Sequence, residues 1–408
     1  MTIGRNLGAT RRIGPVTTTD QHSHTALRLP LRPGLEGLSP YGAPQLDVPV
    51  LLNVNENPYS PSQAVIDSIA TRVAAAAAGL NRYPDRDFDE LRAALADYLL
   101  AESGVALTAD QVWAANGSNE VLLHVHQAFG GPGRTAMSFA PTYSMYPEYA
   151  RDTLTAWVTR DRRPDFSLDA DEVVAALREV RPSIFILASP NNPTGTALEH
   201  DTIKRVLDAA ATTGPATEDG LPAPTVVVID EAYGEFRRRG VPSALELLAD
   251  HPHLAVARTM SKAFGMAGLR LGYLAAATEL IDLLRVVRLP YHLSAVTQAA
   301  ALAGLDHRTE LMAQVASLRE ERDALVVWLR AQGLEVADSD ANFVLFGRFP
   351  DRHAVWQRLL DDGVLIREVG PDGWLRVTVG TPSETQAFKD ALLRAIAATH
   401  HPVPKESQ

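Results

Sequence analysis

The chemistry that this sequence can perform is clearest at Lys262. The chain contains four lysines: Lys204, Lys262, Lys389 and Lys405. Lys262 alone comes shortly after an apolar run, residues 254–257, and its neighbours are largely apolar. Because such surroundings disfavour an ammonium ion, they lower the pKa of a lysine and make its amine nucleophilic. Most lysines are solvated surface residues, so this interpretation depends on what accompanies Lys262.

A carboxylate follows another short apolar run. Asp230 comes directly after residues 226–229 and begins the segment Asp230–Tyr233. A carboxylate at the tip of a buried strand is costly to desolvate unless it meets a cation or a proton donor. A protonated pyridine nitrogen is one such partner. A salt bridge to arginine and a metal ion are the alternatives.

A rigid polar segment follows a third apolar run. Residues 184–188 precede Ser189–Gly195, in which two prolines frame two asparagines. Asn, Pro and Gly are the usual residues of a simple turn, but this segment is more rigid than a turn requires. It therefore suits Asn192 as a fixed hydrogen-bond donor to a ring oxygen.

Small polar residues follow a fourth apolar run. Residues 112–115 precede Asn116–Glu120. Small residues expose backbone N–H groups at the N-terminus of a helix, where an anion is stabilised. An ordinary helix N-cap is the alternative explanation of Ser118 or Asn119.

These four segments form one pattern. Along the chain they supply, in order, an anion-binding helix N-terminus, a hydrogen-bond donor for a ring oxygen, a carboxylate and a lysine. Ser261 and Arg270, which lie close to this lysine in sequence, are suited to holding a phosphate. Pyridoxal 5'-phosphate requires this set. Its ring accepts electrons when a carboxylate keeps the nitrogen protonated, and a lysine attaches it as a Schiff base and then moves the proton. The sequence therefore predicts a pyridoxal-phosphate enzyme, with Lys262 and Asp230 as catalytic residues.

The same apolar runs predict the fold. They are brief and aliphatic, as expected of strands buried on both faces of a sheet, and helical segments such as 121–129 and 169–177 lie between them. This alternation indicates a mostly parallel sheet, whose ligands gather at the carboxyl ends of its strands. After about residue 300, a charged helix at about 309–331 introduces an α+β section. We expect a disordered tail at 1–35, an arm at 36–64, a large cofactor-binding domain at 65–300 and a small C-terminal domain at 301–400.

Composition narrows the possible functions. The 408 residues are 46% hydrophobic and contain no run of apolar residues long enough for a transmembrane helix. The net charge of −11 argues against a nucleic-acid partner. Without cysteine the chain has no disulfides, thiolate nucleophiles or Cys-ligated metals, and we expect no metal site. The first 24 residues lack the apolar core of a secretory signal, so a cytoplasmic enzyme is expected.

Seven segments carry a resemblance to a known family: Leu38–Tyr41, Leu52–Asn57, Arg82–Asp85, Ser189–Gly195, Asp230–Tyr233, Ser261–Lys262 and Leu375–Gly380. From about Leu38 to Ala397 the chain resembles the fold-type I, class I/II pyridoxal-phosphate-dependent aminotransferases, and within them the histidinol-phosphate aminotransferase family. The resemblance implies an α/β fold, with a large domain on a mostly parallel seven-stranded sheet and a smaller α+β domain. It also implies a homodimer with shared active sites.

The resemblance assigns five residues to the cofactor phosphate. By their match to the family, Gly117, Ser118 and Asn119 would line the phosphate cup. Ser261 and Arg270 would grip the same phosphate from the segment that carries the lysine.

The resemblance assigns four residues to the cofactor ring and a fifth, Tyr83, to the neighbouring subunit's cofactor. Tyr143 would stack on the pyridine ring, and Asp230 would pair with its nitrogen. Asn192 and Tyr233 would hydrogen-bond its phenolic oxygen, and Tyr233 counts among the catalytic residues. Tyr83 resembles a tyrosine that reaches the cofactor phosphate of the neighbouring subunit.

Substrate residues follow from the same resemblance. Arg376 matches the arginine that binds the substrate carboxylate. Arginine suits this role, because a guanidinium pairs with a carboxylate through two hydrogen bonds. Arg367 is a candidate for the substrate phosphate. Tyr41, Asn55 and Asn192 match positions near the substrate. A structural ion pair is the alternative for either arginine.

The implied reaction is transamination between L-histidinol phosphate and 2-oxoglutarate, which forms imidazole acetol phosphate and L-glutamate in histidine biosynthesis. The alternatives are an aromatic amino-acid aminotransferase of the same subgroup and a phosphate-substrate decarboxylase. A DNA-binding regulator with an aminotransferase-like domain is disfavoured because no basic recognition helix is visible. The chain departs from the family pattern in three places. Its N-terminus is extended, residues 212–225 are an insertion, and the stretch between Arg367 and Arg376 is shortened.

Overall fold

The computed structural model describes residues 29–40, 42–217 and 219–400, the side chains of the last two excepted. The chain divides into two compact units, Met1–Gly42 and Ala43–Gln408. The described part of the first unit contains turns but neither helix nor strand. The predicted disorder of the tail falls mostly on residues 1–28, which lie outside the described residues, as does Tyr41.

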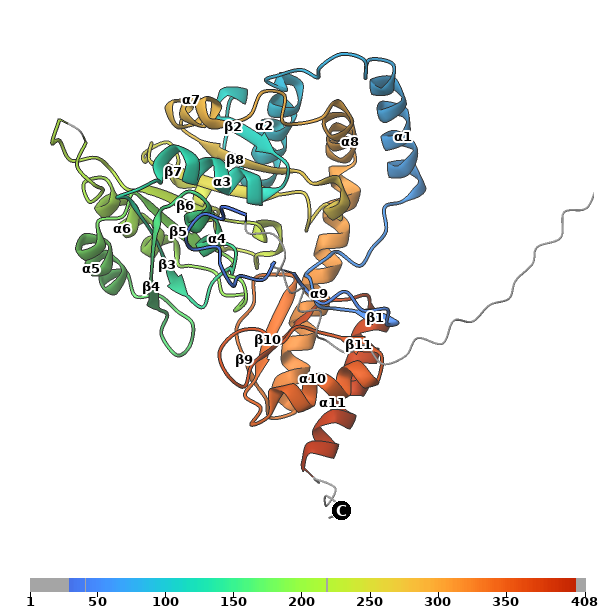
Figure 1. Ribbon diagram of the computed structural model, residues 1–408. Helices are drawn as coiled ribbons and strands as arrows, with labels where there is room; N and C mark the ends of the chain where they lie inside the picture. The colour runs from blue at the N-terminus through green and yellow to red at the C-terminus, as the bar shows by residue number, and fades with distance from the viewer. Residues whose placement is uncertain (1–28, 41, 218, 401–408) are drawn as a thin grey trace, which may run out of the picture. The chain divides into compact units, whose positions relative to one another are not determined.

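The second unit is built on a seven-stranded sheet of order β2-β8-β7-β6-β5-β3-β4 (Figure 1). Its strand β8 is antiparallel to both of its neighbours, and every other neighbouring pair is parallel. This confirms the predicted mostly parallel seven-stranded sheet. The strands are β2 (Val112–Ala115), β3 (Thr135–Ala140), β4 (Ala156–Asp161), β5 (Ile184–Ala188), β6 (Val226–Asp230), β7 (Leu254–Thr259) and β8 (Gly272–Ala276).

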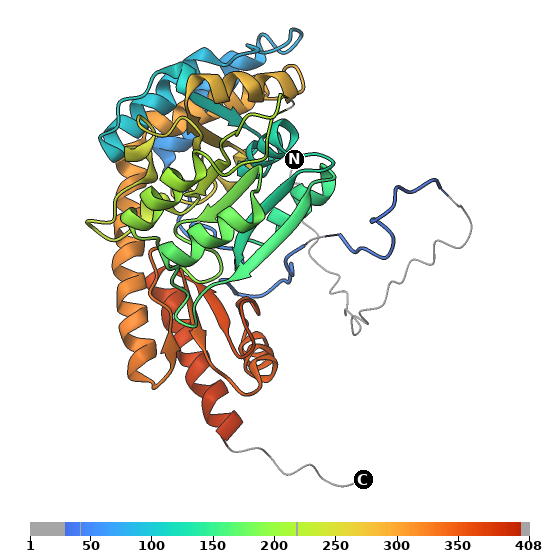
Figure 2. The ribbon, with the colours of Figure 1, turned by 90° about the vertical axis from the view of Figure 1, so that its left-hand side faces the viewer.

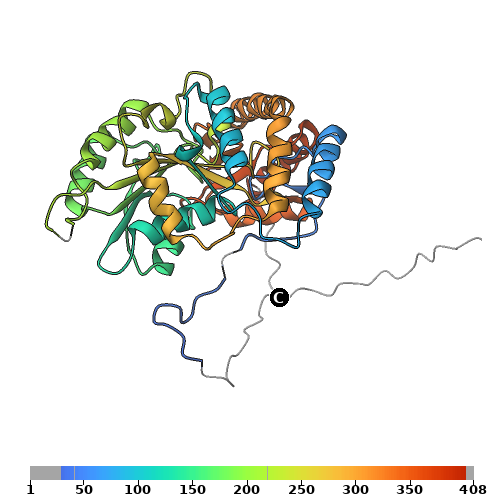
Figure 3. The same ribbon diagram turned by 90° about the horizontal axis from the view of Figure 1, so that it is seen from above.

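Helices cover both faces of this sheet (Figure 2). Every residue of β5, β6 and β7 is buried, so their aliphatic runs contact helices on either side and hold the sheet together by hydrophobic burial. Helix α1 packs against α8 at one side of the unit (Figure 3). The helices of this region are α1 (Gln63–Ala77), α2 (Asp89–Ser103), α3 (Ser118–Phe129), α4 (Tyr146–Asp152), α5 (Ala170–Val180), α6 (His200–Ala210), α7 (Thr278–Val287) and α8 (Ala295–Asp306).

A second, smaller sheet has the antiparallel order β12-β10-β9, and β1 pairs with β11 in parallel beside it. The long helix α9 extends from the seven-stranded sheet to this region (Figure 1). A separate hydrophobic cluster, which includes Phe346, Leu375 and Phe388, forms the core here. The elements are β1 (Val50–Leu51), α9 (Arg308–Ala331), β9 (Glu335–Val336), β10 (Phe343–Gly347), α10 (Arg352–Asp361), β11 (Val364–Leu365), β12 (Leu375–Thr378) and α11 (Pro382–His400).

The predicted insertion at 212–225 is largely exposed and contains an isolated antiparallel bridge between Ala216 and Pro222. Over the described ranges, no helix is both long and apolar enough to cross a membrane. The boundaries expected between the arm, the large domain and the small domain stay predictions.

Candidate active site

The carboxyl ends of the parallel strands bring the predicted residues to one edge of the sheet. Asp230 ends β6, and its Cα pairs with Ala188 at the end of β5. Ala115 at the end of β2 and Thr259 at the end of β7 both pair with Gly272. Because these strands all point the same way, the segments that follow them meet at this edge, where ligands of such sheets bind.

Lys262 lies just beyond β7 and is half-buried. Its Nζ donates a hydrogen bond to the carbonyl oxygen of Val54 at 3.0 Å. Burial, and after it the positive charges of Arg376 and Arg270, lower the pKa of Lys262 to about 8, while the charge of Glu56 acts in the opposite direction. A larger fraction of the amine is therefore neutral and nucleophilic near neutral pH.

Asp230 is buried and bonded on both carboxylate oxygens. Its Oδ2 accepts a hydrogen bond from the Tyr146 hydroxyl at 2.8 Å, and its Oδ1 accepts one from the Ala232 N–H at 3.0 Å. Burial raises the pKa of Asp230, and these two hydrogen bonds lower it. Both of these donors to Asp230 are neutral groups. Among the described residues Asp230 forms no salt bridge with an arginine, which was the alternative considered from the sequence.

Tyr233 is tied to the small sheet through Asn55. The Asn55 Nδ2 donates to the Tyr233 hydroxyl at 2.9 Å. Asn55 has a φ of 58°, and its backbone N–H donates to the Thr378 hydroxyl at 3.0 Å. Asn342 donates to the Asn55 carbonyl at 3.1 Å. Because Thr378 ends β12 and Asn342 precedes β10, the small sheet fixes a residue that touches Tyr233.

The predicted phosphate residues converge at the start of α3. Gly117 caps this 12-residue helix with a φ of 84°, and a Cβ at Gly117 would lie 2.5 Å from an Arg270 guanidinium nitrogen. Only glycine therefore allows the guanidinium to approach. Arg270 also donates to the Ser261 hydroxyl at 3.3 Å. With the first N–H groups of α3 at Ser118 and Asn119, these donors suit a phosphate.

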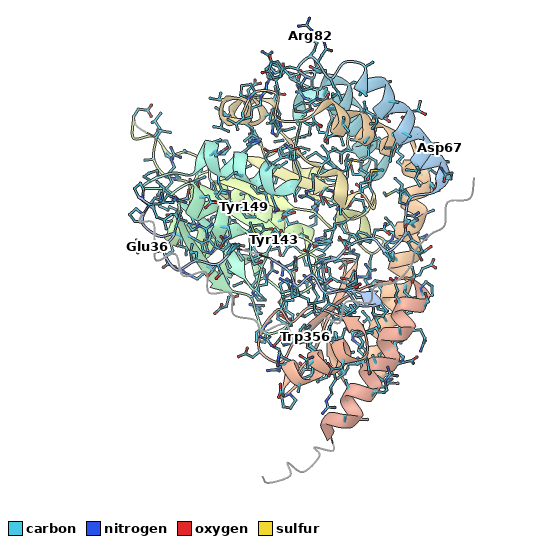
Figure 4. All side chains as sticks on the ribbon, turned by 45° about the vertical axis from the view of Figure 1, so that its right-hand side comes forward. Glu36, Asp67, Arg82, Tyr143, Tyr149 and Trp356 are labelled. Carbon is cyan, nitrogen blue, oxygen red and sulfur yellow. The ribbon has the colours of Figure 1, made fainter. Side chains whose placement is uncertain are left out.

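Tyrosines from the segment after β3 surround Asn119. The Asn119 Oδ1 accepts hydrogen bonds from Tyr149 at 2.8 Å and Tyr143 at 3.4 Å. Tyr143 also contacts Tyr146 edge to face, with ring centroids 5.5 Å apart. Figure 4 shows Tyr143 and Tyr149 close together in the middle of the unit. Tyr143 is half-buried, as a ring that stacks on a cofactor must be.

Two of the predicted substrate residues, Arg367 and Arg376, lie side by side at the small sheet. Arg376 in β12 donates to the Asn192 side-chain oxygen at 2.5 Å and to the Asn53 carbonyl at 2.9 Å. Arg367 and Arg376 exchange two backbone hydrogen bonds as an antiparallel bridge, which places their side chains on one face. Arg367 Nη1 is buried without a hydrogen-bond partner in the described part of the chain. This buried guanidinium nitrogen is therefore available to donate a hydrogen bond to an anion.

Tyr83 lies apart from this group. Its side chain is 79% exposed and stacks on Tyr291 with ring centroids 4.5 Å apart. The adjacent Arg82 lies at the outer end of the unit, far from Tyr143 (Figure 4). Such a position is consistent with the predicted reach into a neighbouring subunit. Tyr41, expected near the substrate, lies outside the described residues.

Sequence analysis missed the residues that hold the predicted ones in place: Asn53, Tyr146, Tyr149, Asn342 and Thr378. One signal was present for two of them. Tyr143, Tyr146 and Tyr149 recur at a spacing of three, which places the last two on one side of a helix. The remainder come from the distant segment around the small sheet and carry no local pattern.

A buried ion network underlies the site and was also missed. Arg258 in β7 is fully buried and pairs with Glu231 at 2.6 Å, with Glu235 at 3.2 Å and with Glu102 at 3.2 Å. Arg237 pairs with Glu231 at 3.0 Å. Glu231 directly follows Asp230, and Arg258 lies four residues before Lys262. The network therefore fastens together the two strands that carry the predicted catalytic residues.

The donors at this edge fit pyridoxal 5'-phosphate. An amine with a lowered pKa would attach the aldehyde, and a buried carboxylate would face the ring nitrogen. The glycine-lined cradle at Gly117, where a Cβ would collide with Arg270, matches a phosphate. The residues brought together here thus fit the amine, carboxylate and phosphate contacts that the cofactor needs.

Comparison with known proteins agrees with this site. The family Aminotransferase class I and II matches residues 48–392. A histidinol-phosphate aminotransferase from Thermobifida fusca is 60% identical over 90% of this chain and 95% of its own, and one from Bifidobacterium longum is 57% identical over 90% and 97%. The crystal structure of histidinol-phosphate aminotransferase from Sinorhizobium meliloti in complex with pyridoxal-5'-phosphate superposes with a TM-score of 0.74 at 25% identity, covering 86% of this chain and 92% of that one.

The chain belongs to the class I and II aminotransferases. The expected fold type I and the expected class of enzyme, a pyridoxal-phosphate-dependent aminotransferase, are confirmed. The resemblance to histidinol-phosphate aminotransferases is confirmed by relatives that cover nearly the whole chain.

Proposed function

We propose that this chain transfers the amino group of L-histidinol phosphate to 2-oxoglutarate, forming imidazole acetol phosphate and L-glutamate in histidine biosynthesis. The observation that carries the proposal is the pair of arginines on the small sheet, one of which has a buried nitrogen without a partner. Relatives of the same activity at 60% and 57% identity support it.

The two arginines account for two substrates in one site. Glutamate and histidinol phosphate each carry an amino group and an anion, and they must bind in turn. Arg376 would bind the carboxylate of glutamate, since Asn192 and the Asn53 carbonyl hold its guanidinium in place. Arg367 would bind the phosphate of histidinol phosphate through Nη1.

The proposed catalytic roles follow from the geometry at the strand ends. Bound pyridoxal 5'-phosphate supplies an electrophilic carbon and a ring that accepts electrons. Lys262 would attach the cofactor and then carry the proton at its Nζ, which a pKa of about 8 suits. Asp230 would hold positive charge on the ring nitrogen, and Tyr233 and Asn192 would hydrogen-bond the ring oxygen.

The remaining cofactor contacts complete the proposal. Tyr143 would cover the ring. Ser118 and Asn119, next to Gly117 at the start of α3, would bind the phosphate through their N–H groups. Ser261 and Arg270, already bonded to each other, would bind it from the opposite side.

We also propose that the chain forms a homodimer with shared active sites. We propose that this enzyme is cytoplasmic. Exposed apolar side chains near Tyr83 and Tyr291 support an interface. Val286 is 79% exposed and Leu289 is 76% exposed, and exposed apolar clusters of this kind mark association surfaces. Tyr83 would then reach the phosphate of the neighbouring cofactor.

The substrate is tested by comparing kcat/KM for histidinol phosphate with kcat/KM for phenylalanine. We expect a clear preference for histidinol phosphate, and a preference for phenylalanine would make the chain an aromatic amino-acid aminotransferase. Arg367→Gln should raise KM for histidinol phosphate by about 10- to 100-fold, as expected for a lost charged hydrogen bond. It should leave phenylalanine turnover nearly unchanged. Arg348→Gln, an exposed arginine of the small sheet, is the matched control.

A further inference from the structure

Tyr146 and Asp230 form a buried pair behind the proposed ring position. Tyr146 is fully buried in the first turn of α4, and its hydroxyl donates to Asp230 Oδ2 at 2.8 Å. The Ala232 N–H occupies the other oxygen. Each carboxylate oxygen can accept two hydrogen bonds, so one donor on each leaves room for a third donor, the N–H of a protonated ring.

The Tyr146 ring is fixed from several directions. Helix α4 packs against β4, and the Tyr146 ring lies 6.5 Å from that of Trp157 in that strand. The Tyr143 ring contacts it edge to face at 5.5 Å. Because its surroundings are packed, the phenol cannot turn away from Asp230. Tyr146 is therefore a fixed donor rather than an incidental neighbour.

A buried arginine lies beyond Tyr146. Arg162 follows β4 and is 7% exposed. Its Nη1 donates to the Phe166 carbonyl at 3.2 Å, while Nε and Nη2 have no hydrogen-bond partner within the described ranges. Burial lowers the pKa of Arg162 to about 10, and the charge of an ionised Tyr146 would act against that. A cation near a phenol strengthens the phenol as a hydrogen-bond donor.

Burial keeps this phenol protonated. The pKa of Tyr146 is raised well above its usual value, first by burial and then by the negative charge of Asp230. Tyr146 can thus donate this hydrogen bond at neutral pH. Its hydrogen bond lowers the pKa of Asp230 and opposes the effect of burial on that carboxyl group.

We propose that Tyr146 is a positioning residue that keeps Asp230 ionised and directed at the ring nitrogen of the cofactor. This inference rests on the proposed function. Without the phenolic hydrogen bond, the proton on the ring nitrogen would move to Asp230, leaving a neutral acid beside a neutral ring. No other bond changes, but the ring accepts electrons less well.

The test uses the holoenzyme reconstituted with pyridoxal 5'-phosphate labelled with ¹⁵N at the ring nitrogen. The ¹⁵N chemical shift reports protonation directly, without turnover. We expect the shift of a protonated ring in the unaltered enzyme and a displacement towards the unprotonated shift in Tyr146→Phe. We expect kcat to fall by about 10- to 100-fold, the range for one hydrogen bond to a charged group, with KM nearly unchanged.

Controls separate this role from simple loss of a buried hydroxyl. Tyr273→Phe removes a fully buried hydroxyl that makes no hydrogen bond among the described residues, and it should keep the protonated shift and kcat. If Tyr146→Phe does not fold, incorporation of 3-fluorotyrosine at Tyr146 keeps the shape and the donor, and the protonated shift should persist.

Each outcome decides the proposal. An unaltered ¹⁵N shift in Tyr146→Phe overturns it, and so does loss of the protonated shift with 3-fluorotyrosine. In both cases the proposed function stands as long as the unaltered enzyme converts histidinol phosphate. If the unaltered chain does not bind the cofactor, the proposed function fails first and this inference fails with it.

Discussion

The pKa of Lys262 gives a prediction that needs no substrate. In the cofactor-free chain, burial and the positive charge of Arg376 lower this pKa from its ordinary 10.5 to about 8. At pH 7 the neutral fraction of the amine is then about one in ten, against about one in 3,000 for an unperturbed lysine. The neutral, reactive fraction of Lys262 should therefore be about 300-fold larger than that of an unperturbed lysine.

The same perturbation has a defined effect on stability. In the unfolded chain Lys262 keeps its proton up to about pH 10.5, whereas in the folded chain it releases it near pH 8. Between these values the unfolded state binds more protons, so the folded state gains stability as the pH rises. From below pH 8 to above pH 10.5, the free energy of unfolding should rise by about 3 kcal/mol through this one group. Below pH 8 the cost of burying the ammonium group is fully present.

Trace acetylation of the cofactor-free chain at increasing pH, followed by mass spectrometry of lysine peptides, measures this pKa. Lys262 should show a midpoint near pH 8. Lys204 is the internal comparison, because its ion pair with Asp208 raises its pKa and delays its labelling to higher pH. Arg376→Gln should move the Lys262 midpoint upwards, since a like charge is removed. A Lys262 midpoint near 10.5, or no movement in Arg376→Gln, would refute the electrostatic reasoning.

Three further predictions concern neighbouring groups. Asp230→Asn should lower kcat by about 10²- to 10⁴-fold, which is the usual contribution of a positioned acid–base or charge-stabilising group. Single-turnover kinetics measure this loss, and a near-normal rate would contradict the role proposed for Asp230. Arg258→Met leaves Glu231 and Glu235 buried without the cation that they share. It should lower the free energy of unfolding, measured by urea denaturation, by about 3–5 kcal/mol. An unchanged denaturation midpoint would show that the network is dispensable. Tyr83→Phe should increase cofactor dissociation at concentrations where the chain is dimeric, measured by absorbance after gel filtration, and equal retention would argue against a shared site.

The sequence predicted the strands that carry the site because their residues are apolar on both faces. The runs at 112–115 and 184–188 coincide with β2 and β5, and the long helix expected at 309–331 is α9. Strand β4 carries no such run, because all six of its residues are half-buried or exposed and two are charged. A strand at the edge of a sheet lacks the continuous apolar pattern, so local reasoning passes over it.

The predicted site residues were found by type and by their place after a strand, which is local information. Their supports were not found, because those contacts join distant parts of the chain. Thr378 reaches Asn55 across 323 positions, and Tyr146 reaches Asp230 across 84. A hydrogen bond of this kind leaves no spacing pattern in a single sequence. It forms only when the folded chain brings the two distant segments together.

The need for both sheets explains why the site has this architecture. The large sheet supplies the amine and the carboxylate, whose strands are fastened together by Arg258 and therefore hold a fixed separation. The small sheet supplies the two arginines and, through Asn55, a hydrogen bond to Tyr233. A substrate anion bound on the arginines would strengthen the contact between the sheets, because Arg376 is already bonded to Asn192 of the large-sheet side. If the proposed function is right, binding of the substrate anion would therefore also help to align the catalytic groups.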